Sequence, residues 1–221
     1  MKTIKRKPSR ARRAVRSVAV LLCVLAAYVV LSGMKLTPRA AIRMGEQYYG
    51  SYEPTHTVAM QRMRVGGRSC RVYLTAGENS LYCGAARLTP SGWDIIFMGD
   101  AIACADGESV HAGWWDMARN GAKDVFYWGR VDDAAITSAV IERYRAVSQD
   151  ENGEYTFEKR AAFAAELIED GDYRYFLTGG VVTGPNYDDL AWDRVYFVGY
   201  DASGAEVLRY EIERQMSTSF G

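Results

Sequence analysis

The sequence predicts a mostly β (α+β) protein with an N-terminal transmembrane helix, a short amphipathic helix, and an antiparallel β-sandwich or barrel-like ectodomain. Three observations predict this class. A stretch of 18 residues near the N-terminus carries no charge. A helical pattern that begins with proline follows it, and short runs rich in Val, Tyr and Trp then recur about every ten residues. With 221 residues and 48% hydrophobic content, the chain is long enough to bury a core.

The uncharged stretch runs from Ser17 to Met34 and is rich in Leu, Val and Ala. A helix of that length spans roughly 27 Å, close to the hydrocarbon thickness of a bilayer. Residues 1–16 carry eight Lys and Arg and no acid, so the positive-inside rule predicts a cytoplasmic N-terminus and an extracytoplasmic remainder. A cleaved signal peptide is the alternative, but Leu25 and Leu31 stand where a cleavage site needs a small residue.

Composition divides the chain into four segments. A basic cytoplasmic tail (1–16) and a transmembrane helix (17–34) precede a helix plus β-meander subdomain (35–131) and a second β-rich subdomain (132–221), which either folds separately or shares one core with the first. All 27 acids lie beyond the apolar stretch, so the part from Lys35 onward has a net charge of −8 and the leader +8. An acidic body offers no track for phosphates, which excludes nucleic acid as a partner of the main domain. The basic leader predicts contact with anionic membrane lipid.

Local signals predict the first elements after the apolar stretch. Thr37 suits an N-cap and Pro38 suits the first helical position, so we expect a helix from Pro38 to about Tyr48, ended by Gly50. The tetrapeptide AGEN at residues 76–79 predicts a β-hairpin with a strand on each side. The run DVFYWGRV at residues 124–131 predicts a further strand.

The later segments differ in how clearly they predict structure. AITSAVIERYR at residues 135–145 matches a helix and a strand equally, and FEKRAAFAAELIEDG at residues 157–171 has high helix propensity, with a strand pair as the alternative. The clearest hairpin is WDRVYFVGY-DASG-AEVLRYEIE at residues 192–213, in which Asp201 and Gly204 supply the turn chemistry.

Several of these pieces together carry a resemblance to known proteins. They are TPRAAIR just after the apolar stretch, SGW at the end of a hairpin, YWGRVDDAAI, and the final YDASGAEVL. With its basic leader and single apolar stretch, the chain resembles uncharacterised single-pass membrane proteins of Gram-positive bacteria that have a β-rich extracytoplasmic domain. The resemblance covers scattered pieces of residues 37–213, and it implies topology and fold but no reaction and no site residues.

The sequence lacks the motifs that mark common catalytic and metal sites. It has only two histidines and contains no H-E-x-x-H, G-x-S-x-G, Walker A, G-x-G-x-x-G or C-x-x-C motif. We therefore assign no catalytic, cofactor-binding or metal-ligating residue and expect no cofactor. Asn186, Asp188, Asp189 and Asp193 offer oxygen ligands for Ca²⁺, but their spacing matches no EF-hand, so a solvated acidic loop is the expectation.

A sortase-like Cys transpeptidase is the most concrete enzyme alternative. Cys104 ends a predicted strand, and its conceivable partners are His56 or His111 together with Arg119 or Arg130. The Thr-Leu-x-Thr-Cys pattern of sortases is missing because Ala103 precedes the cysteine, so a buried structural thiol is the expectation.

Two further cysteines, Cys70 and Cys83, flank the predicted AGEN hairpin. A disulfide between them is one expectation for an oxidising exterior, and two reduced thiols are the other.

The five tryptophans either fill a sandwich core, which is the favoured expectation, or line a carbohydrate platform. They are Trp93, Trp114, Trp115, Trp128 and Trp192. The sequence thus predicts a membrane-anchored extracytoplasmic binding or accessory protein of the bacterial cell envelope, whose envelope protein or glycan partner it does not identify. An envelope enzyme and a protein secreted after signal cleavage are the alternatives.

Overall fold

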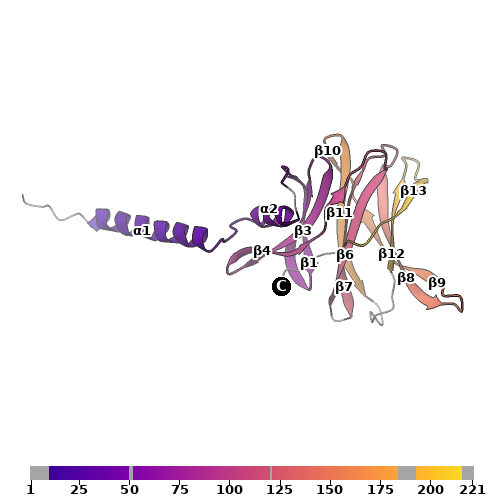
Figure 1. Ribbon diagram of the computed structural model, residues 1–221, viewed down its shortest axis with the longest axis horizontal. Coiled ribbons are helices and arrows are strands. Elements are labelled where there is room, and N and C mark those ends of the chain that lie inside the picture. The colour runs from indigo at the N-terminus through magenta and orange to yellow at the C-terminus, as the bar shows by residue number, and fades with distance from the viewer. Residues whose placement is uncertain (1–9, 50–51, 120, 184–192, 216–221) are drawn as a thin grey trace, which may run out of the picture.

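The computed structural model describes residues 10–49, 52–119, 121–183 and 193–215, and within these ranges two helices precede thirteen strands (Figure 1). The strands form three sheets in which every pairing between strands is antiparallel. The mostly β class predicted from the sequence is confirmed.

Helix α1 (Arg10–Leu31) extends away from the rest of the molecule (Figure 1), and none of its residues is buried. Its length and composition are those of a single membrane span or of a signal sequence. The helix begins seven residues before Ser17, the first residue of the predicted span, because the preceding segment is rich in Arg and Ala, which are good helix formers.

Helix α2 (Pro38–Tyr48) confirms the helix predicted there. Thr37 is the N-cap, and its hydroxyl oxygen accepts a hydrogen bond of 3.1 Å from the Ala40 amide. Ala41, Ile42 and Gly45 are buried on the face that packs against the first sheet.

The first sheet has the order β1-β2-β3-β4, with β5 paired to β3. Its strands are β1 (His56–Val65), β2 (Arg68–Ala76), β3 (Ser80–Thr89), β4 (Gly92–Met98) and β5 (Ile102–Ala103). The predicted hairpin is present, because Thr75 and Tyr82 are paired on either side of the AGEN turn.

The middle sheet has the order β10-β11-β7-β6 and the third sheet the order β13-β12-β8-β9. The middle sheet consists of β6 (Val110–Arg119), β7 (Ala122–Val131), β10 (Ile168–Asp170) and β11 (Tyr173–Thr183). The third sheet consists of β8 (Ser138–Gln149), β9 (Tyr155–Ala165), β12 (Asp193–Tyr200) and β13 (Glu206–Glu211). Strands from segments 35–131 and 132–221 pair within the middle sheet, and both segments contribute residues to the clusters on its two faces.

Strand β7 is covered on both faces. Phe126 and Trp128 enter the core between the first and middle sheets, whereas Val125 and Tyr127 enter the core between the middle and third sheets. Because both faces are buried, the strand is an almost continuous apolar run rather than an alternating one.

The two ambiguous segments are both strands, β8 and β9. The helix propensity of residues 157–165 is overridden because β9 pairs along its length with β8, and its core-facing residues Ala161, Phe163 and Ala165 recur with a period of two. Alanine on both faces hides this period in the sequence. The final hairpin is confirmed, with Asp201 accepting backbone hydrogen bonds from Ser203 and Ala205.

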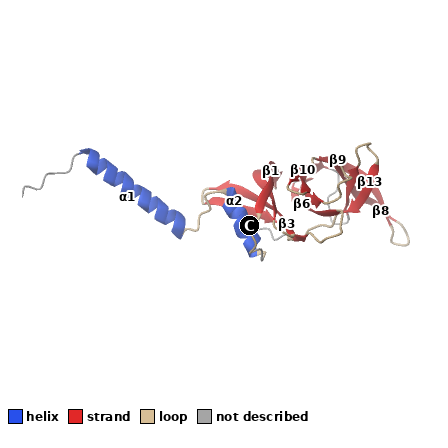
Figure 2. Cartoon of the chain, turned by 90° about the horizontal axis from the view of Figure 1, so that it is seen from above, coloured by secondary structure: helices blue, strands red, loops and turns tan. Residues whose placement is uncertain are grey.

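The layers follow one another along the length of the molecule. Figures 1 and 2 show α2 and the first sheet at the end of the β-rich part that is joined to α1, and the third sheet at the far end. The outer face of the first sheet carries α2, while its inner face meets the middle sheet.

Helix α2 is held on the first sheet by a buried carboxylate. Glu46 is fully buried, and its carboxylate accepts hydrogen bonds from Arg39 (2.8 Å), Arg43 (3.0 Å) and the hydroxyls of Thr55 and Thr75 (2.6 Å each). Burial alone would raise the pKa of Glu46, but these hydrogen bonds outweigh burial and hold its pKa below the ordinary value.

Glu46→Gln is expected to lower the free energy of unfolding by about 2 kcal/mol at pH 7, because the amide cannot accept all four hydrogen bonds. A lowered folded-state pKa stabilises the fold above the ordinary pKa of about 4.5, and that stabilisation disappears as the pH falls through the folded-state pKa. The difference between variant and wild type should therefore shrink toward pH 3. Urea unfolding monitored by tryptophan fluorescence measures it. Glu78→Gln, at an exposed position, is the control, and equal effects at pH 7 would contradict the proposed role of Glu46.

Candidate functional site

The linker between α1 and α2, residues 32–37, lies against the turn between β3 and β4. The Trp93 amide donates a 2.8 Å hydrogen bond to the carbonyl oxygen of Lys35. Gly92 has a φ of 110°, and a Cβ at this position would lie 2.8 Å from the same carbonyl oxygen. Glycine therefore permits a backbone conformation and a close approach that other residues would not. As a result, the chain contacts the first sheet within a few residues of the end of α1.

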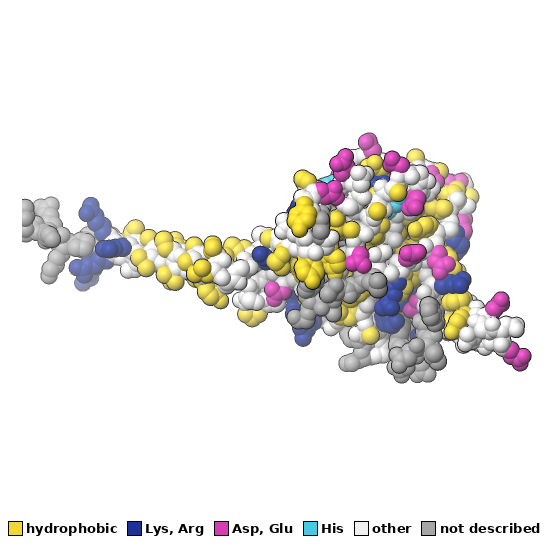
Figure 3. All heavy atoms as spheres, in the orientation of Figure 1, with side chains coloured by type: hydrophobic (Ala, Val, Ile, Leu, Met, Phe, Trp, Pro, Cys, Tyr) yellow, Lys and Arg dark blue, Asp and Glu magenta, His cyan; other side chains and the backbone are white. Residues whose placement is uncertain are grey.

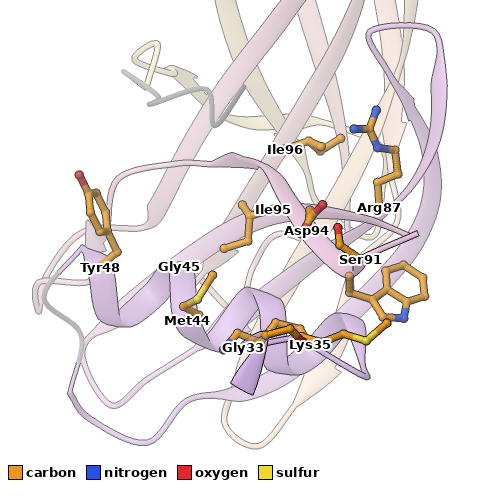
Figure 4. Close-up of a pocket in the computed structure, with 13 residues that line it drawn as sticks. Gly33, Lys35, Met44, Gly45, Tyr48, Arg87, Ser91, Asp94, Ile95 and Ile96 are labelled. Atoms are coloured by element: carbon orange, nitrogen blue, oxygen red, sulfur yellow. The ribbon is translucent and has the colours of Figure 1, made fainter. Parts of the chain in front are cut away.

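A cavity of about 560 Å³ opens where the linker, α2 and the β3–β4 hairpin meet (Figure 4). We call it the linker pocket. Its volume lies within the range of small-molecule sites, which is roughly 300–1,000 Å³. Linker residues 32–35 form one wall, and α2 contributes Met44, Gly45 and Tyr48. The hairpin contributes Arg87 and residues 91 and 93–96.

The linker pocket combines apolar and cationic side chains. Met44 and Tyr48 are 45% and 70% exposed although they belong to a helix that packs on a sheet, and Trp93 of the hairpin lines the same cavity. The charged residues of the lining are Lys35, Arg87 and Asp94, so cations outnumber acids two to one. Such a lining suits a ligand that has an apolar part and a negatively charged group.

Trp93 is further fixed by a cation–π contact, because the Arg71 guanidinium carbon lies 5.0 Å from the centre of its ring. The sequence indicated SGW only as the end of a hairpin. It gave no indication of a pocket, since three segments that are separate in the chain build it.

A second polar cluster contains three of the residues that the enzyme alternative named. His111 and Arg130 are cross-strand partners on β6 and β7, and Cys104 lies close enough to Arg130 to interact electrostatically with it. Arg130 donates two hydrogen bonds, of 2.7 and 2.6 Å, to the carboxylate of Asp132. His111 lies with Nε2 3.4 Å from the same carboxylate and with Nδ1 3.2 Å from Glu108.

The electrostatics of this cluster do not activate the cysteine. Burial raises the pKa of the Cys104 thiol to about 11, even though Arg130 acts in the opposite direction. A pocket of about 340 Å³, lined by Asn79 and residues 103–106, opens beside the thiol. The cluster therefore has the residue types of a cysteine nucleophile site but holds the sulfur as a neutral thiol at pH 7.

The other two residues named for the enzyme alternative lie elsewhere. His56 is at the start of β1, where its Nε2 lies 2.6 Å from a carboxylate oxygen of Asp170. Arg119 is the last residue of β6, at the opposite end of that strand from His111. Of the proposed combinations, only Cys104, His111 and Arg130 come together.

The disulfide considered between Cys70 and Cys83 is not formed, and both residues are buried free thiols. The register of β2 and β3 places Leu74, not Cys70, opposite Cys83. Four residues along a strand correspond to about 13 Å, which is beyond the reach of a disulfide. The AGEN turn predicted the hairpin, but not how far each cysteine lies from it.

A buried ionic cluster connects the middle and third sheets. Arg143 is almost fully buried; it donates a 2.8 Å hydrogen bond to Asp116, pairs also with Asp193, and lies with its guanidinium carbon 4.7 Å from the Trp114 ring centre. Lys123 lies 3.2 Å from Asp116. Burial would raise the pKa of Asp116, but these cations outweigh it and lower the pKa. The charges of this cluster are thus paired with one another, and the cluster holds the middle and third sheets together.

Asp193 is the only one of the four considered calcium ligands that lies within the described residues, and it belongs to this cluster; residues 186, 188 and 189 lie outside them. The part of the chain that the structure describes holds no group of three or more His, Cys, Asp and Glu residues suited to a metal ion. Trp114, Trp115 and Trp128 are buried in the cores, which agrees with the expectation that tryptophans fill the core. Trp192 lies outside the described residues.

The chain matches no model of a protein family and no curated protein. The linker pocket and the charges around it are therefore the basis for a functional proposal.

Cys104 in the native protein should react with iodoacetamide far more slowly than an exposed thiol at pH 7. Its raised pKa leaves roughly one thiolate in ten thousand, and the rate should rise about tenfold for each pH unit between 7 and 9. Peptide mass spectrometry of the alkylated protein, with the urea-unfolded chain as the control, measures this rate. A native rate at pH 7 equal to that of the unfolded chain would contradict the raised pKa, and a faster rate would show an activated sulfur.

Proposed function

We propose that this chain is an extracytoplasmic binding or accessory protein of the bacterial cell envelope, held by α1 in the membrane with its N-terminus in the cytoplasm. We further propose that the linker pocket is its binding site. One observation carries the proposal: the pocket is built in part by residues 32–35, which directly follow α1. With α1 in a bilayer, the pocket lies at the membrane surface.

The character of α1 supports this anchor. None of the residues of the helix is buried, and its apolar part is long enough to cross the hydrocarbon region. Eight basic residues precede its uncharged part, and all acids follow it, which favours retention of the N-terminus on the cytoplasmic side.

The lining of the linker pocket supports an amphiphilic ligand. A ligand that lies in the outer leaflet would reach the pocket without leaving the membrane surface. Its apolar part would contact Met44, Trp93 and Ile95, and its negatively charged group would lie near Lys35 and Arg87.

A cysteine-dependent envelope enzyme is the second candidate function. It is favoured by the grouping of Cys104, His111 and Arg130 beside a pocket. The raised pKa of the thiol and the pairing of Arg130 with Asp132 count against it. Cys104→Ala separates the two functions, because a binding protein should keep its cellular phenotype in a folded variant.

The anchor proposal predicts that external protease digests residues 35–221 on intact cells and spares the N-terminal tail. Mass spectrometry of the membrane-bound protein should also find the peptide that begins at Met1 or Thr3, because an anchor is not cleaved. Cells made permeable before protease treatment are the control. A mature N-terminus located after residue 31 would instead support the secreted alternative.

The pocket proposal predicts cross-links between the linker pocket and a bilayer amphiphile. Full-length protein in nanodiscs is irradiated with phosphatidylglycerol that carries a diazirine in its acyl chain. Cross-links are expected on α2 and β4 in addition to α1, and Met44→Trp should reduce those on α2 and β4 about tenfold by filling the cavity.

Val207→Trp on β13 is the matched control for this experiment, because Val207 has a similar exposure of 44% and lies in the third sheet. It should leave the cross-links unchanged. Cross-links confined to α1 in the wild type would contradict the pocket as a site for a bilayer ligand.

A further inference from the structure

The outer face of the first sheet is only partly covered by α2. The cluster between helix and sheet includes residues of β2, β3 and β4 but none of β1. Tyr73 of β2 belongs to that cluster and is paired with Met60, and the next pairs on the same face are Arg62 with Arg71 and Arg64 with Ser69. We call this uncovered area the basic face, and define it by Met60, Arg62, Arg64, Ser69 and Arg71.

The cations of the basic face form no ion pair with any residue that the structure describes. Arg62 and Arg64 are exposed, and neither forms an ion pair with a described residue. Arg71 is partly buried and also forms no ion pair with a described residue, and its guanidinium group lies over the Trp93 ring. By contrast, in the middle and third sheets Arg130, Arg143 and Arg209 all pair with carboxylates.

The charges of the ectodomain are divided between its two ends. Residues 35–103, which form α2 and the first sheet, have eight Lys and Arg against five Asp and Glu, a net charge of +3. Residues 104–221 have 11 against 22, a net charge of −11. Figure 3 shows acidic side chains gathered mainly over the part of the ectodomain away from α1.

The position of the basic face relative to α1 identifies what it meets. Only six residues separate α1 from α2, and the hydrogen bond from Trp93 to Lys35 ties this linker to the first sheet. The outer face is also the end of the stack of layers nearest α1 (Figures 1 and 2). Two exposed apolar side chains, Met60 at 48% and Leu88 at 63%, accompany the cations there.

We propose that the basic face docks on the anionic lipid headgroups of the bilayer that holds α1. This inference rests on the proposed anchor but not on a ligand in the linker pocket. Each basic residue near an anionic membrane surface strengthens binding about fivefold, and the effect falls off within a Debye length. Residues 104–221, with their net charge of −11, are repelled by the same surface, so docking fixes which end of the ectodomain faces the membrane.

Lipid-dependent quenching of a site-specific label tests this docking in the full-length protein in nanodiscs. A bimane fluorophore is placed at Ser69→Cys on the basic face or at Ser203→Cys in the β12–β13 turn, both in a Cys23→Ala background. The remaining cysteines are buried and unreactive under mild labelling. A nitroxide on the lipid headgroup is the quencher.

With about one third phosphatidylglycerol, the label at position 69 should be quenched about threefold more than in pure phosphatidylcholine. The label at position 203 should not be quenched in either bilayer. Salt at about 0.5 M should abolish the difference, because it screens the exposed charges. Equal quenching at position 69 in both lipids would overturn the proposal. An acidic protein would then be the alternative partner of the basic face.

Charge variants separate docking from general electrostatics. Arg62→Gln with Arg64→Gln should reduce quenching at position 69 to the phosphatidylcholine level. The matched control, Arg160→Gln with Arg194→Gln, removes two half-exposed cations of the third sheet and should have no effect; an equal effect would overturn the proposal. Docking that persists when pocket cross-links are absent would leave this inference intact and remove only the pocket proposal.

Discussion

The arrangement of the whole ectodomain depends on the burial of the middle sheet on both faces. Strand β7 supplies Phe126 and Trp128 to one core and Val125 and Tyr127 to the other, so a sheet must cover each side. The first and third sheets are therefore outer layers, each with one face that no other sheet covers. Because the linker fixes the first sheet beside α1, the outer face of that sheet lies toward the anchor.

The first sheet differs from the middle and third sheets in how its cations are paired. In the middle and third sheets, Arg130, Arg143 and Arg209 pair with carboxylates, as in the buried cluster of Arg143 with Asp116 and Asp193. An unpaired charge at such depth would be strongly destabilising. On the outer face of the first sheet, Glu46 of α2 forms ion pairs only with Arg39 and Arg43, and Arg62 and Arg64 beyond the helix stay exposed. The exposed set is thus available to a negatively charged surface.

Capping and turn residues in the sequence predicted the elements that begin or end at them. Thr37 and Pro38 predicted the start of α2, and Asp201 with Gly204 predicted the last hairpin. Strand β9 was obscured because its alanines favour a helix and show no alternation, and only pairing with β8 decides its structure. The register that separates Cys70 from Cys83 is likewise a property of the paired strands and not of either one alone.

The functional surfaces were harder to predict than the fold. The linker pocket requires the linker, α2 and a hairpin to meet, and no single segment indicates it. The basic face, however, has a sequence signal in the division of charge between residues 35–103 and 104–221. The net charge of the whole ectodomain does not show that division. The division can be interpreted only when the order of the layers shows that the first sheet lies next to α1.

Neutron reflectometry of the full-length protein in a supported bilayer containing phosphatidylglycerol would measure most directly whether the first sheet rests on the membrane. If it does, protein density begins at the headgroups without an intervening layer of water. A continuous water layer between the headgroups and the ectodomain would show instead that the β-rich part is held away from the bilayer by the linker.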